Sequence, residues 1–342
     1  MPAADSDPAL LAPARSVPLS ESRRPSFSVV VAAWQAAPTV ATAVRSALEQ
    51  TTSPHEVVVC DDGSTDDVAA ALAPFGDQVR LLRIPHSGAS VARNTAAATV
   101  SGDFIAILDA DDVWQPRRLQ RLGDLSVARP DLDLLTTDAW LLVGGERRGR
   151  FYDAAAFPVE DQRIEILRRN FFFAHVAVRR TAWLAHGGLA PDLARGEDWD
   201  LWLRLLFAGS LAGCVAEPLA DYRVHAASLS ADRAASLMAR VTVLERAAAT
   251  QRLTPAQRDV LSRARAGYLR RARAARAERA LIEAVAGRRR ACLELLLTPG
   301  GSTRGRVLTA AAVLAPGWAG HRLRRDLVRD GRARSDRVIG SR

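Results

Sequence analysis

The chain has 342 residues, which is long enough for one large α/β domain with an appended segment. Hydrophobic residues make up 48% of it and charged residues 25%, a composition that is typical of folded globular proteins and excludes the disordered and fibrous classes. No apolar run is long enough to span a bilayer, because the longest, residues 307–319, is interrupted by Pro316 and Gly317.

The net charge of +9 is distributed unevenly along the chain. All 47 basic residues are arginine, and residues 231–342 hold 25 of them against nine acidic residues, so residues 1–230 are net acidic. The basic C-terminal region fits peripheral contact with an anionic membrane or a lipid-linked acceptor. Alternatively, the arginines only keep a helical appendage soluble. Nucleic acid is disfavoured as a partner, because no aromatic residues interleave with the arginines.

The N-terminal residues and the cysteines bear on the cellular compartment. Residues 1–25 are rich in Pro, Ala, Ser and Asp without periodicity, which predicts a disordered leader. They lack the basic start and long apolar stretch of a signal peptide. Cys60, Cys214 and Cys292 are widely spaced, which fits free thiols in a reducing compartment. Together these features predict a cytoplasmic protein.

From Phe27 onward, short apolar runs alternate with amphipathic segments, and only a few residues connect them. This alternation predicts a largely parallel sheet with right-handed crossover connections. The strands that it predicts are residues 28–33, 56–60, 79–84 and 104–108. The helices that it predicts are residues 38–48, 66–72, 88–100 and 116–128.

After about residue 130 the pattern changes and predicts that the sheet becomes mixed. The strands expected here are residues 133–143, 148–157 and 174–178, and the helices are residues 160–170, 182–186 and 196–206. The Arg-rich region has no strand signal, and its expected helices are residues 241–250, 255–286 and 288–297. We therefore expect one domain over residues 26–230, with halves 26–130 and 131–230, followed by a helical extension over residues 231–342.

The apolar stretch of residues 103–112 ends in a cluster of carboxylates. Residues 104–108 predict a buried strand, so the acids that follow emerge at the carboxyl end of the sheet, where open α/β sheets bind ligands. Asp109 and Asp111 project to the same side in extended geometry, which suits Mg²⁺ or Mn²⁺ bridging to a diphosphate. The alternative is an acidic N-cap, with Asp112 opening the next helix.

Three more charged residues in the first half are candidates for nucleotide binding. Asp61 and Asp62 end the second predicted strand before a Gly-Ser turn, where carboxylates can accept hydrogen bonds from a nucleobase or a ribose. Arg93 lies near the start of a helix, where its guanidinium could pair with a diphosphate. The alternatives are a capped turn for the two aspartates and an ordinary surface position for the arginine.

The second half offers a candidate base and a candidate metal ligand. Glu197 and Asp198 begin a helix, where an ionised carboxylate could take the proton from an attacking hydroxyl. The alternative is a favourable helix N-terminal charge. His225 follows a β-like stretch and could complete the coordination of a metal, although a lone histidine is more often structural. The other histidines interpreted as structural or positional are His86, His175 and His186.

Five motifs follow one another in the order found in glycosyltransferase family 2, and the chain resembles that family from residue 27 to about residue 230. The motifs are DDGSTD at residues 61–66, SGASVARN at 87–94, LDADDVW at 108–114, GEDWDLWLR at 196–204 and YRVH at 222–225. One such motif is a weak signal, whereas five in order are highly specific.

The resemblance implies a GT-A fold, which is an α/β fold with a mixed, mostly parallel sheet, a nucleotide-diphosphate sugar donor, an Mg²⁺ or Mn²⁺ cofactor and inversion at the anomeric carbon. It implies Asp198 as the catalytic base, with Asp111 and His225 as metal ligands. The nucleotide-sugar-binding residues that it implies are Ala33, Trp34, Asp61, Asp62, Arg93, Asp109, Ala110 and Glu197.

One motif departs from the family pattern. Family members usually begin with Pro-Thr-Tyr-Asn, whereas this chain has Ala32-Ala33-Trp34-Gln35. Trp34 can still stack on a base, so the change bears on donor identity more than on activity.

The sequence thus predicts an enzyme that transfers one sugar, with a UDP-sugar as the expected donor, to a glycan or lipid-linked acceptor in cell-surface polysaccharide or glycoconjugate synthesis. A processive synthase is disfavoured, because the chain has no Gln-x-x-Arg-Trp motif. A catalytically inactive binding module, recruited through its basic tail, is the alternative of a different class. Retention of the acidic motifs and His225 argues against it.

Overall fold

The computed structural model describes residue 7 and residues 9–13, 23–224 and 232–285. Four features considered from the sequence lie outside these residues. They are His225, Cys292, the expected helix over residues 288–297 and the apolar segment of residues 307–319.

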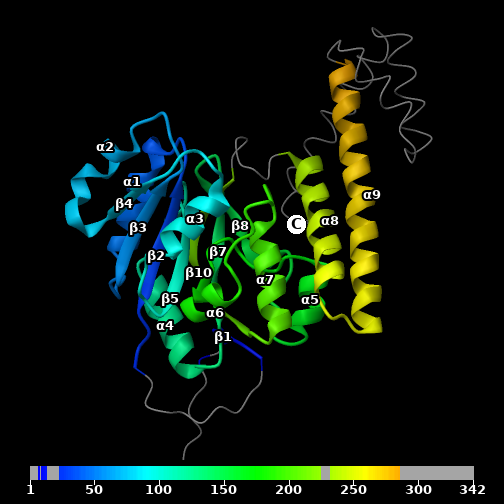
Figure 1. Ribbon diagram of the computed structural model, residues 1–342, viewed down its shortest axis with the longest axis horizontal. Helices are drawn as coiled ribbons and strands as arrows, with labels where there is room; N and C mark the ends of the chain where they lie inside the picture. Colours follow the sequence, from blue (N-terminus) through cyan, green and yellow to red (C-terminus); the bar gives the residue numbers. More distant parts are fainter. Residues whose placement is uncertain (1–6, 8, 14–22, 225–231, 286–342) are drawn as a thin grey trace, which may run out of the picture.

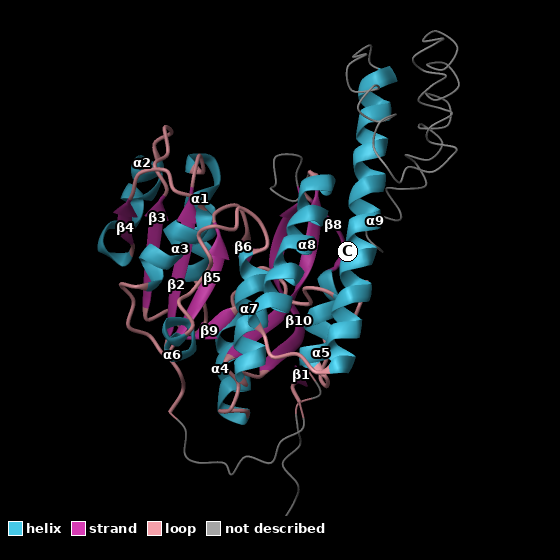
Figure 2. Ribbon diagram, turned by 45° about the vertical axis from the view of Figure 1, so that its right-hand side comes forward, coloured by secondary structure: helices cyan, strands magenta, loops and turns pink. Residues whose placement is uncertain are grey.

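Four parallel strands form the first half of the sheet, as the sequence predicts. Figure 2 shows them in the order β4, β3, β2 and β5. They are β2 (Phe27–Ala33), β3 (Glu56–Asp61), β4 (Arg80–Arg83) and β5 (Phe104–Asp109). All four point the same way, so their carboxyl ends meet at one edge of the sheet.

The strands after residue 130 make the sheet mixed, which confirms the expectation from the sequence. Strand β9 is antiparallel to both β5 and β7, whereas β10 is parallel to β7. The expected strand over residues 148–157 is wrong beyond residue 150, where a short 3₁₀ helix at Phe151–Asp153 turns the chain. The strands here are β6 (Val113–Trp114), β7 (Leu134–Val143), β8 (Glu146–Arg150), β9 (Ala177–Arg179) and β10 (Ala212–Val224).

The expected disordered leader contains a short strand, β1 (Leu10–Leu11), so that prediction is wrong for these two residues. Leu10 and Leu11 pair antiparallel with Val215 and Cys214 of β10. An apolar pair that covers a strand edge satisfies backbone groups that the edge would otherwise leave open. Composition alone cannot reveal such a contact, because the strand that pairs with Leu10 and Leu11 lies about two hundred residues away in the sequence.

Helices cover both faces of the sheet, because alternate strand residues point to opposite faces. Val29 and Val31 pack in one cluster with the helices α1, α2 and α4, whereas Val30 packs in the other with α3, α5, α6 and α7. The first three are α1 (Ala37–Leu48), α2 (Val68–Leu72) and α4 (Arg118–Ala128). The others are α3 (Ala89–Ala97), α5 (Gln162–Arg168), α6 (Arg180–Ala185) and α7 (Glu197–Ala208).

Two long C-terminal helices, α8 (Arg233–Thr250) and α9 (Pro255–Val285), lie side by side against α7 and α5 (Figure 1). Leu237, Val241 and Leu244 of α8 belong to the same buried cluster as Trp202 of α7. The described part of the helical extension therefore shares a core with the sheet domain. Among the described helices, none has the length and apolarity that a membrane span requires.

Candidate functional site

The register of the parallel strands brings the first candidate residues together. Ala33, the last residue of β2, is paired with Asp61 of β3, and Ala32 is paired with Asp109 of β5. The carboxyl ends of three neighbouring strands thus carry two of the predicted aspartates, at the sheet edge where α/β proteins bind ligands. Ala33 is fully buried, so it contributes backbone and shape to this edge.

Asp61 and Asp62 are both buried, and their carboxylates hold the loops that follow β3 and β4. Asp61 accepts a hydrogen bond of 2.9 Å from the backbone N–H of Ser64. Asp62 accepts bonds of 2.7 Å and 2.9 Å from the backbone N–H groups of Ser87 and Gly88. These contacts fit the capped-turn alternative, and the binding of a nucleobase by either aspartate stays a prediction.

Trp34 lies just beyond β2 with 54% of its surface exposed. Its ring stacks on that of His86, with 4.8 Å between centroids and 21° between planes. Gln35, at a φ of 51°, donates its backbone N–H to Ser64 and its side-chain amide to Thr65. The two loops therefore fix an exposed aromatic platform above the ends of β2 and β3, which is suitable for stacking a base.

Arg93 of α3 contacts carboxylates from two distant parts of the chain. Its Nη2 lies 2.6 Å from Asp109 Oδ1, and its Nη1 lies 3.2 Å from Glu197 Oε1. Burial raises the pKa of the Asp109 carboxyl, but Arg93 outweighs this effect and holds that pKa below its usual value. Burial raises the pKa of the Glu197 carboxyl, and the neighbouring Asp198 carboxylate raises it further. Arg93 thus joins the end of β5 to the start of α7.

Asp198, the predicted base, lies in the first turn of α7 beside this ion pair. Its Oδ2 accepts a hydrogen bond of 3.0 Å from Asn170 Nδ2, while Asn170 Oδ1 accepts one of 3.1 Å from the Phe172 backbone N–H. These two bonds fix which way the amide points. Burial raises the pKa of the Asp198 carboxyl above its usual value, although Arg93 and Asn170 oppose the shift. A base with a raised pKa is better matched to neutral pH.

The turn after β5 holds Ala110, Asp111 and Asp112 above a buried polar network. Ala110 is buried, and Asp112 Oδ1 accepts a hydrogen bond of 2.7 Å from the Arg223 backbone N–H at the end of β10. Asp112 Oδ2 lies 2.9 Å from Nε2 of the buried His175. Burial raises the pKa of the Asp112 carboxyl. The turn therefore ties the acidic motif to the strand that leads into residue 225.

His175 is completely buried beneath this turn. Its Nδ1 accepts a hydrogen bond of 3.0 Å from Trp114 Nε1, and its carbonyl accepts one from the buried guanidinium of Arg118. The side chains of Asp109, Asp112 and His175 place their possible ligand atoms within 4.8 Å of one another. Nε2 of His175 accepts a long bond of 3.5 Å from the Asp109 backbone N–H. The carboxylate oxygens of Asp109 and Asp112 are the better ligands for a hard divalent cation.

The structure brings Arg93, Asp109, Glu197 and Asp198 together, and it places Asp111 on the adjoining turn. Asp61, Asp62 and Trp34 lie on neighbouring strand ends of the same sheet. The metal ligand expected at residue 225 lies outside the described residues. Sequence reasoning missed Asn170, although a single amide before three phenylalanines is an unusual polar position that could have drawn attention.

The mixed sheet flanked by helices, with the acidic turn after β5 and the carboxylate pair at the start of α7, is the GT-A fold that the motifs indicated. The model of the family called glycosyl transferase family 2 matches residues 28–180. Over these residues the chain is similar to glycosyltransferase family 2, which confirms the resemblance that the motifs indicated.

Two similar proteins support this similarity. The succinoglycan biosynthesis protein ExoO of Rhizobium meliloti is 31% identical over 59% of this chain and 61% of its own length. The UDP-Glc:alpha-D-GlcNAc-diphosphoundecaprenol beta-1,3-glucosyltransferase WfaP of Escherichia coli is 28% identical over 64% of this chain and 85% of its own. The chain thus spans less than two thirds of ExoO.

Among solved structures, the mannosyltransferase PcManGT from Pyrobaculum calidifontis, in complex with GDP-Man and Mn²⁺, is similar in fold. It has a TM-score of 0.55 and 20% identity, and the match covers 89% of this chain and 89% of that one. At this level of identity the likeness concerns the fold alone.

Arg93 generates a prediction about stability, because it is the cation between two partly buried carboxylates. We expect Arg93→Met to lower the free energy of unfolding by roughly 2 kcal/mol, less than for a fully buried pair. As a control, Arg80→Met removes an exposed partner of Glu56 and should cost less than about 1 kcal/mol. Urea denaturation measures both, and equal losses would contradict a special role of Arg93 in balancing charge.

Proposed function

We propose that this protein is an inverting glycosyltransferase that moves one sugar from a nucleotide-diphosphate sugar to an acceptor hydroxyl. The observation that carries the proposal is the contact of Arg93 with both Asp109 and Glu197. It joins the acidic end of β5, on the predicted donor side, to the helix start that holds the predicted base. A donor and an acceptor bound on these two sides would meet at Asp198.

The reaction that this arrangement supports is a direct displacement. Asp198 takes the proton of the acceptor hydroxyl while that oxygen forms a bond to the anomeric carbon. The bond from that carbon to the diphosphate breaks on the opposite face, and its electron pair leaves with the nucleoside diphosphate. Asn170 holds one oxygen of Asp198, which leaves the other to face the hydroxyl. One base is sufficient for inversion, so no covalent intermediate is required.

The acidic turn fits the divalent cation that the family implies. Carboxylate oxygens are the ligands that Mg²⁺ and Mn²⁺ prefer, and the possible ligand atoms of Asp109, Asp112 and His175 lie within 4.8 Å of one another. Asp111 with His225 is the predicted ligand pair, and Asp109 and Asp112 lie beside it. A bound cation would supply positive charge opposite the leaving diphosphate.

We propose a UDP-sugar as the donor and cell-surface polysaccharide or glycoconjugate synthesis as the pathway. The names of two relatives support this: WfaP is named for UDP-Glc, and ExoO for succinoglycan biosynthesis. We further propose a glycan or lipid-linked acceptor. No described feature favours an inactive binding module, since Asp109, Asp111 and Asp198 are all present at the site.

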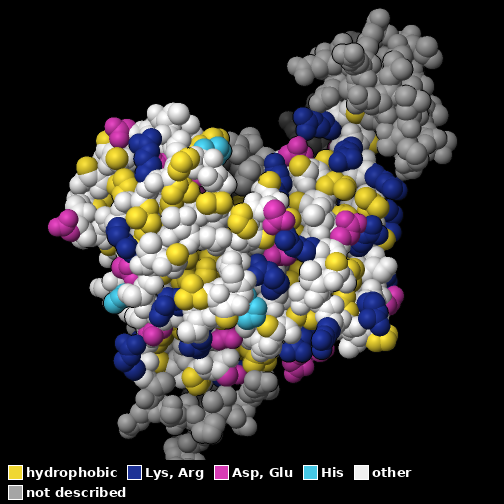
Figure 3. Space-filling view, viewed as in Figure 1, with side chains coloured by type: hydrophobic (Ala, Val, Ile, Leu, Met, Phe, Trp, Pro, Cys, Tyr) yellow, Lys and Arg dark blue, Asp and Glu magenta, His cyan; other side chains and the backbone are white. Residues whose placement is uncertain are grey.

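The outer face of α9 supports peripheral contact with an anionic membrane from the cytoplasmic side. Figure 3 shows dark-blue arginine side chains along this helix. Arginine forms bidentate contacts with phosphate, so such a face suits anionic headgroups. Exposed arginines of α9 that can form this surface include Arg258, Arg263, Arg270, Arg273 and Arg276.

Replacing the base tests the proposed chemistry. We expect Asp198→Asn to lower kcat for sugar transfer by about 10²–10⁴, because the amide cannot take a proton. The nucleotide affinity and the unfolding midpoint should stay at their wild-type values. Burial raises the pKa of the Asp198 carboxyl. As the pH is lowered, the wild-type rate should therefore begin to fall at a pH above the usual pKa of an aspartate. Near wild-type turnover of the variant in a donor-panel assay would refute the site assignment.

Metal dependence is tested separately with Mn²⁺ alone. We expect Mn²⁺ to raise the melting temperature of the wild type, and Asp111→Asn to abolish this shift because it removes an anionic ligand. Asp77→Asn, an exposed aspartate on another part of the chain, removes the same charge and serves as the control. If both variants keep the Mn²⁺ shift in scanning fluorimetry, the assignment of Asp111 is wrong.

Membrane contact predicts dependence on lipid charge. We expect the protein to co-sediment with vesicles containing phosphatidylglycerol and to remain in solution with neutral vesicles. Changing Arg270, Arg273 and Arg276 together to Gln should lower the membrane partition constant roughly 10²-fold, at about 1 kcal/mol per arginine near the surface. Changing the exposed Arg45, Arg80 and Arg148 to Gln should not. Binding that ignores lipid charge would count against the proposal.

A further inference from the structure

The two C-terminal helices contact the helix that carries Glu197 and Asp198, although the proposed chemistry uses none of their residues. We infer that α8 and α9 position the catalytic base, with Arg246 and Tyr268 as the positioning residues. The inference rests on the proposed function, because it assigns these helices a role through Asp198. The family match ends at residue 180 and therefore says nothing about the role of α8 and α9. The inference assigns them one.

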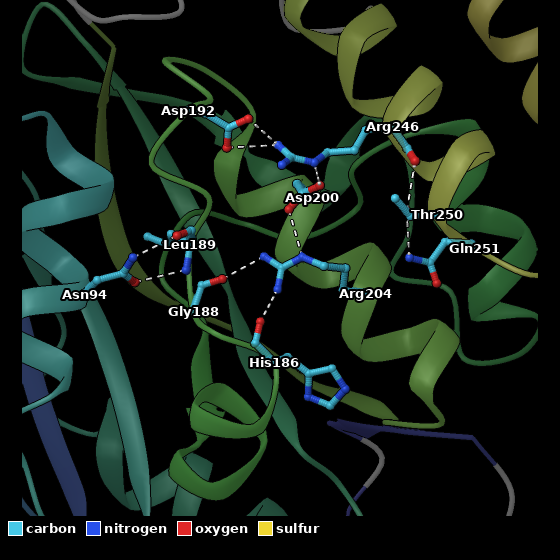
Figure 4. A network of polar contacts seen from close by, with 10 residues as sticks. All are labelled: Asn94, His186, Gly188, Leu189, Asp192, Asp200, Arg204, Arg246, Thr250 and Gln251. Carbon is cyan, nitrogen blue, oxygen red and sulfur yellow. Dashed lines mark hydrogen bonds and ion pairs between the residues drawn. The ribbon is translucent and has the colours of Figure 1, made fainter.

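Helix α8 holds the first turn of α7 through charge. The Nη1 of Arg246 lies 3.0 Å and 3.1 Å from the two carboxylate oxygens of Asp192, and its Nε lies 3.6 Å from Asp200 Oδ1. Asp200 follows Asp198 by two residues and is only 4% exposed. Its other oxygen accepts a hydrogen bond of 2.9 Å from Arg204 (Figure 4). A buried carboxylate held from two sides leaves this turn little freedom.

The same network reaches the helix of Arg93. Arg204 also donates to the carbonyls of His186 and Gly188, in the loop before α7 (Figure 4). In that loop, the backbone of Leu189 accepts a hydrogen bond of 2.7 Å from the Asn94 side chain and donates one of 3.0 Å back to it. Because Asn94 adjoins Arg93 in α3, the start of α7 is fixed between α3 and α8.

Helix α8 also touches the residue that precedes the carboxylate pair. Gly196 is the N-cap of α7 and has a φ of +75°, a conformation that favours glycine. A Cβ built at this position would lie 3.1 Å from a methyl group of Val243, so α8 closes the space around the cap. The path of the chain into Glu197 and Asp198 is therefore set partly by α8.

Helix α9 holds the other side of the base. The hydroxyl of Tyr268 donates a hydrogen bond of 3.0 Å to the carbonyl of Arg168, the last residue of α5. Its ring packs edge-on against Trp199, which follows Asp198, with 5.8 Å between centroids. Trp199 Nε1 in turn donates a buried bond of 2.9 Å to the carbonyl of Ile166. The end of α5 is thus fixed just before Asn170, the hydrogen-bond donor to Asp198.

Two guanidinium groups hold the Tyr268 ring itself. Arg240 of α8 and Arg271 of α9 lie 5.4 Å and 4.5 Å from its centroid. Such cation–π contacts add to the burial of this ring, which is only 3% exposed. Trp199, Asp200 and the segment that ends at Asn170 are therefore each linked to α8 or α9 by a chain of contacts.

The experiment compares variants of these contacts within the full chain. A small misplacement of a catalytic group lowers the rate, so we expect Arg246→Ala and Tyr268→Phe each to lower kcat roughly tenfold. The KM for the donor and the affinity for UDP should stay unchanged, because the donor side lies on β2, β3 and β5. Arg246→Lys keeps the positive charge and should recover part of kcat.

The matched control is Arg265→Ala. Arg265 of α9 pairs with Glu245 of α8 through contacts that do not involve α7, with its Nε 2.8 Å from the Glu245 carboxylate. This variant should lower the unfolding midpoint as the others do while leaving kcat at its wild-type value. If Arg246→Ala and Tyr268→Phe also keep wild-type kcat, or if all three variants lose kcat equally, the inference is overturned.

Amide hydrogen exchange separates this inference from the proposed function. We expect Arg246→Ala and Tyr268→Phe to speed exchange over residues 196–201 and 166–172, and Arg265→Ala to leave it unchanged. A wild-type protein without transferase activity would refute the proposed function, and the exchange rates would still decide whether the helices fix these segments. Unchanged exchange in all variants would overturn the inference even if the enzyme is active.

Discussion

The site depends on the contact of Arg93 with Asp109 and Glu197. Without this cation, the end of β5 and the start of α7 would bring three carboxylates, including Asp198, into a partly buried space. Mutual repulsion and burial would then raise all of their pKa values and protonate the base that the reaction needs. The primary role of Arg93 is thus to neutralise the carboxylates of Asp109 and Glu197 within the protein. Any contact that it makes with a nucleotide would be added to that role.

The strands that build the site could be predicted because each is a short apolar run ending in a polar turn. Asp61 and Asp109 mark the ends of β3 and β5 directly in the sequence. Strand β10 was recognised only as a β-like stretch, since Glu217 and Pro218 interrupt its alternation and its register shifts at Pro218. A strand held mainly by its neighbours gives little local signal.

The surroundings of the base could not be predicted for a different reason. Asp198 stands out because it begins a helix in a recognisable motif, whereas Asn170, Arg246 and Tyr268 matter only through tertiary contacts. Residues 28 to 70 positions away in the sequence orient it. Periodicity predicted α9 correctly, yet it could only suggest which face is buried. It gave no sign that the buried Tyr268 would meet Trp199.

The stacked pair of Trp34 and His86 has a consequence for how nucleobases are distinguished. A base that docks on Trp34 must either replace the imidazole or cover the open side of the indole. In the first case one aromatic contact is exchanged for another, so stacking adds little net affinity. Choice among purines and pyrimidines then falls to groups around the rim of the heterocycle, where a missing donor or acceptor is costly. Stacking on Trp34 would therefore accept different nucleobases, and the polar groups around it would distinguish between them.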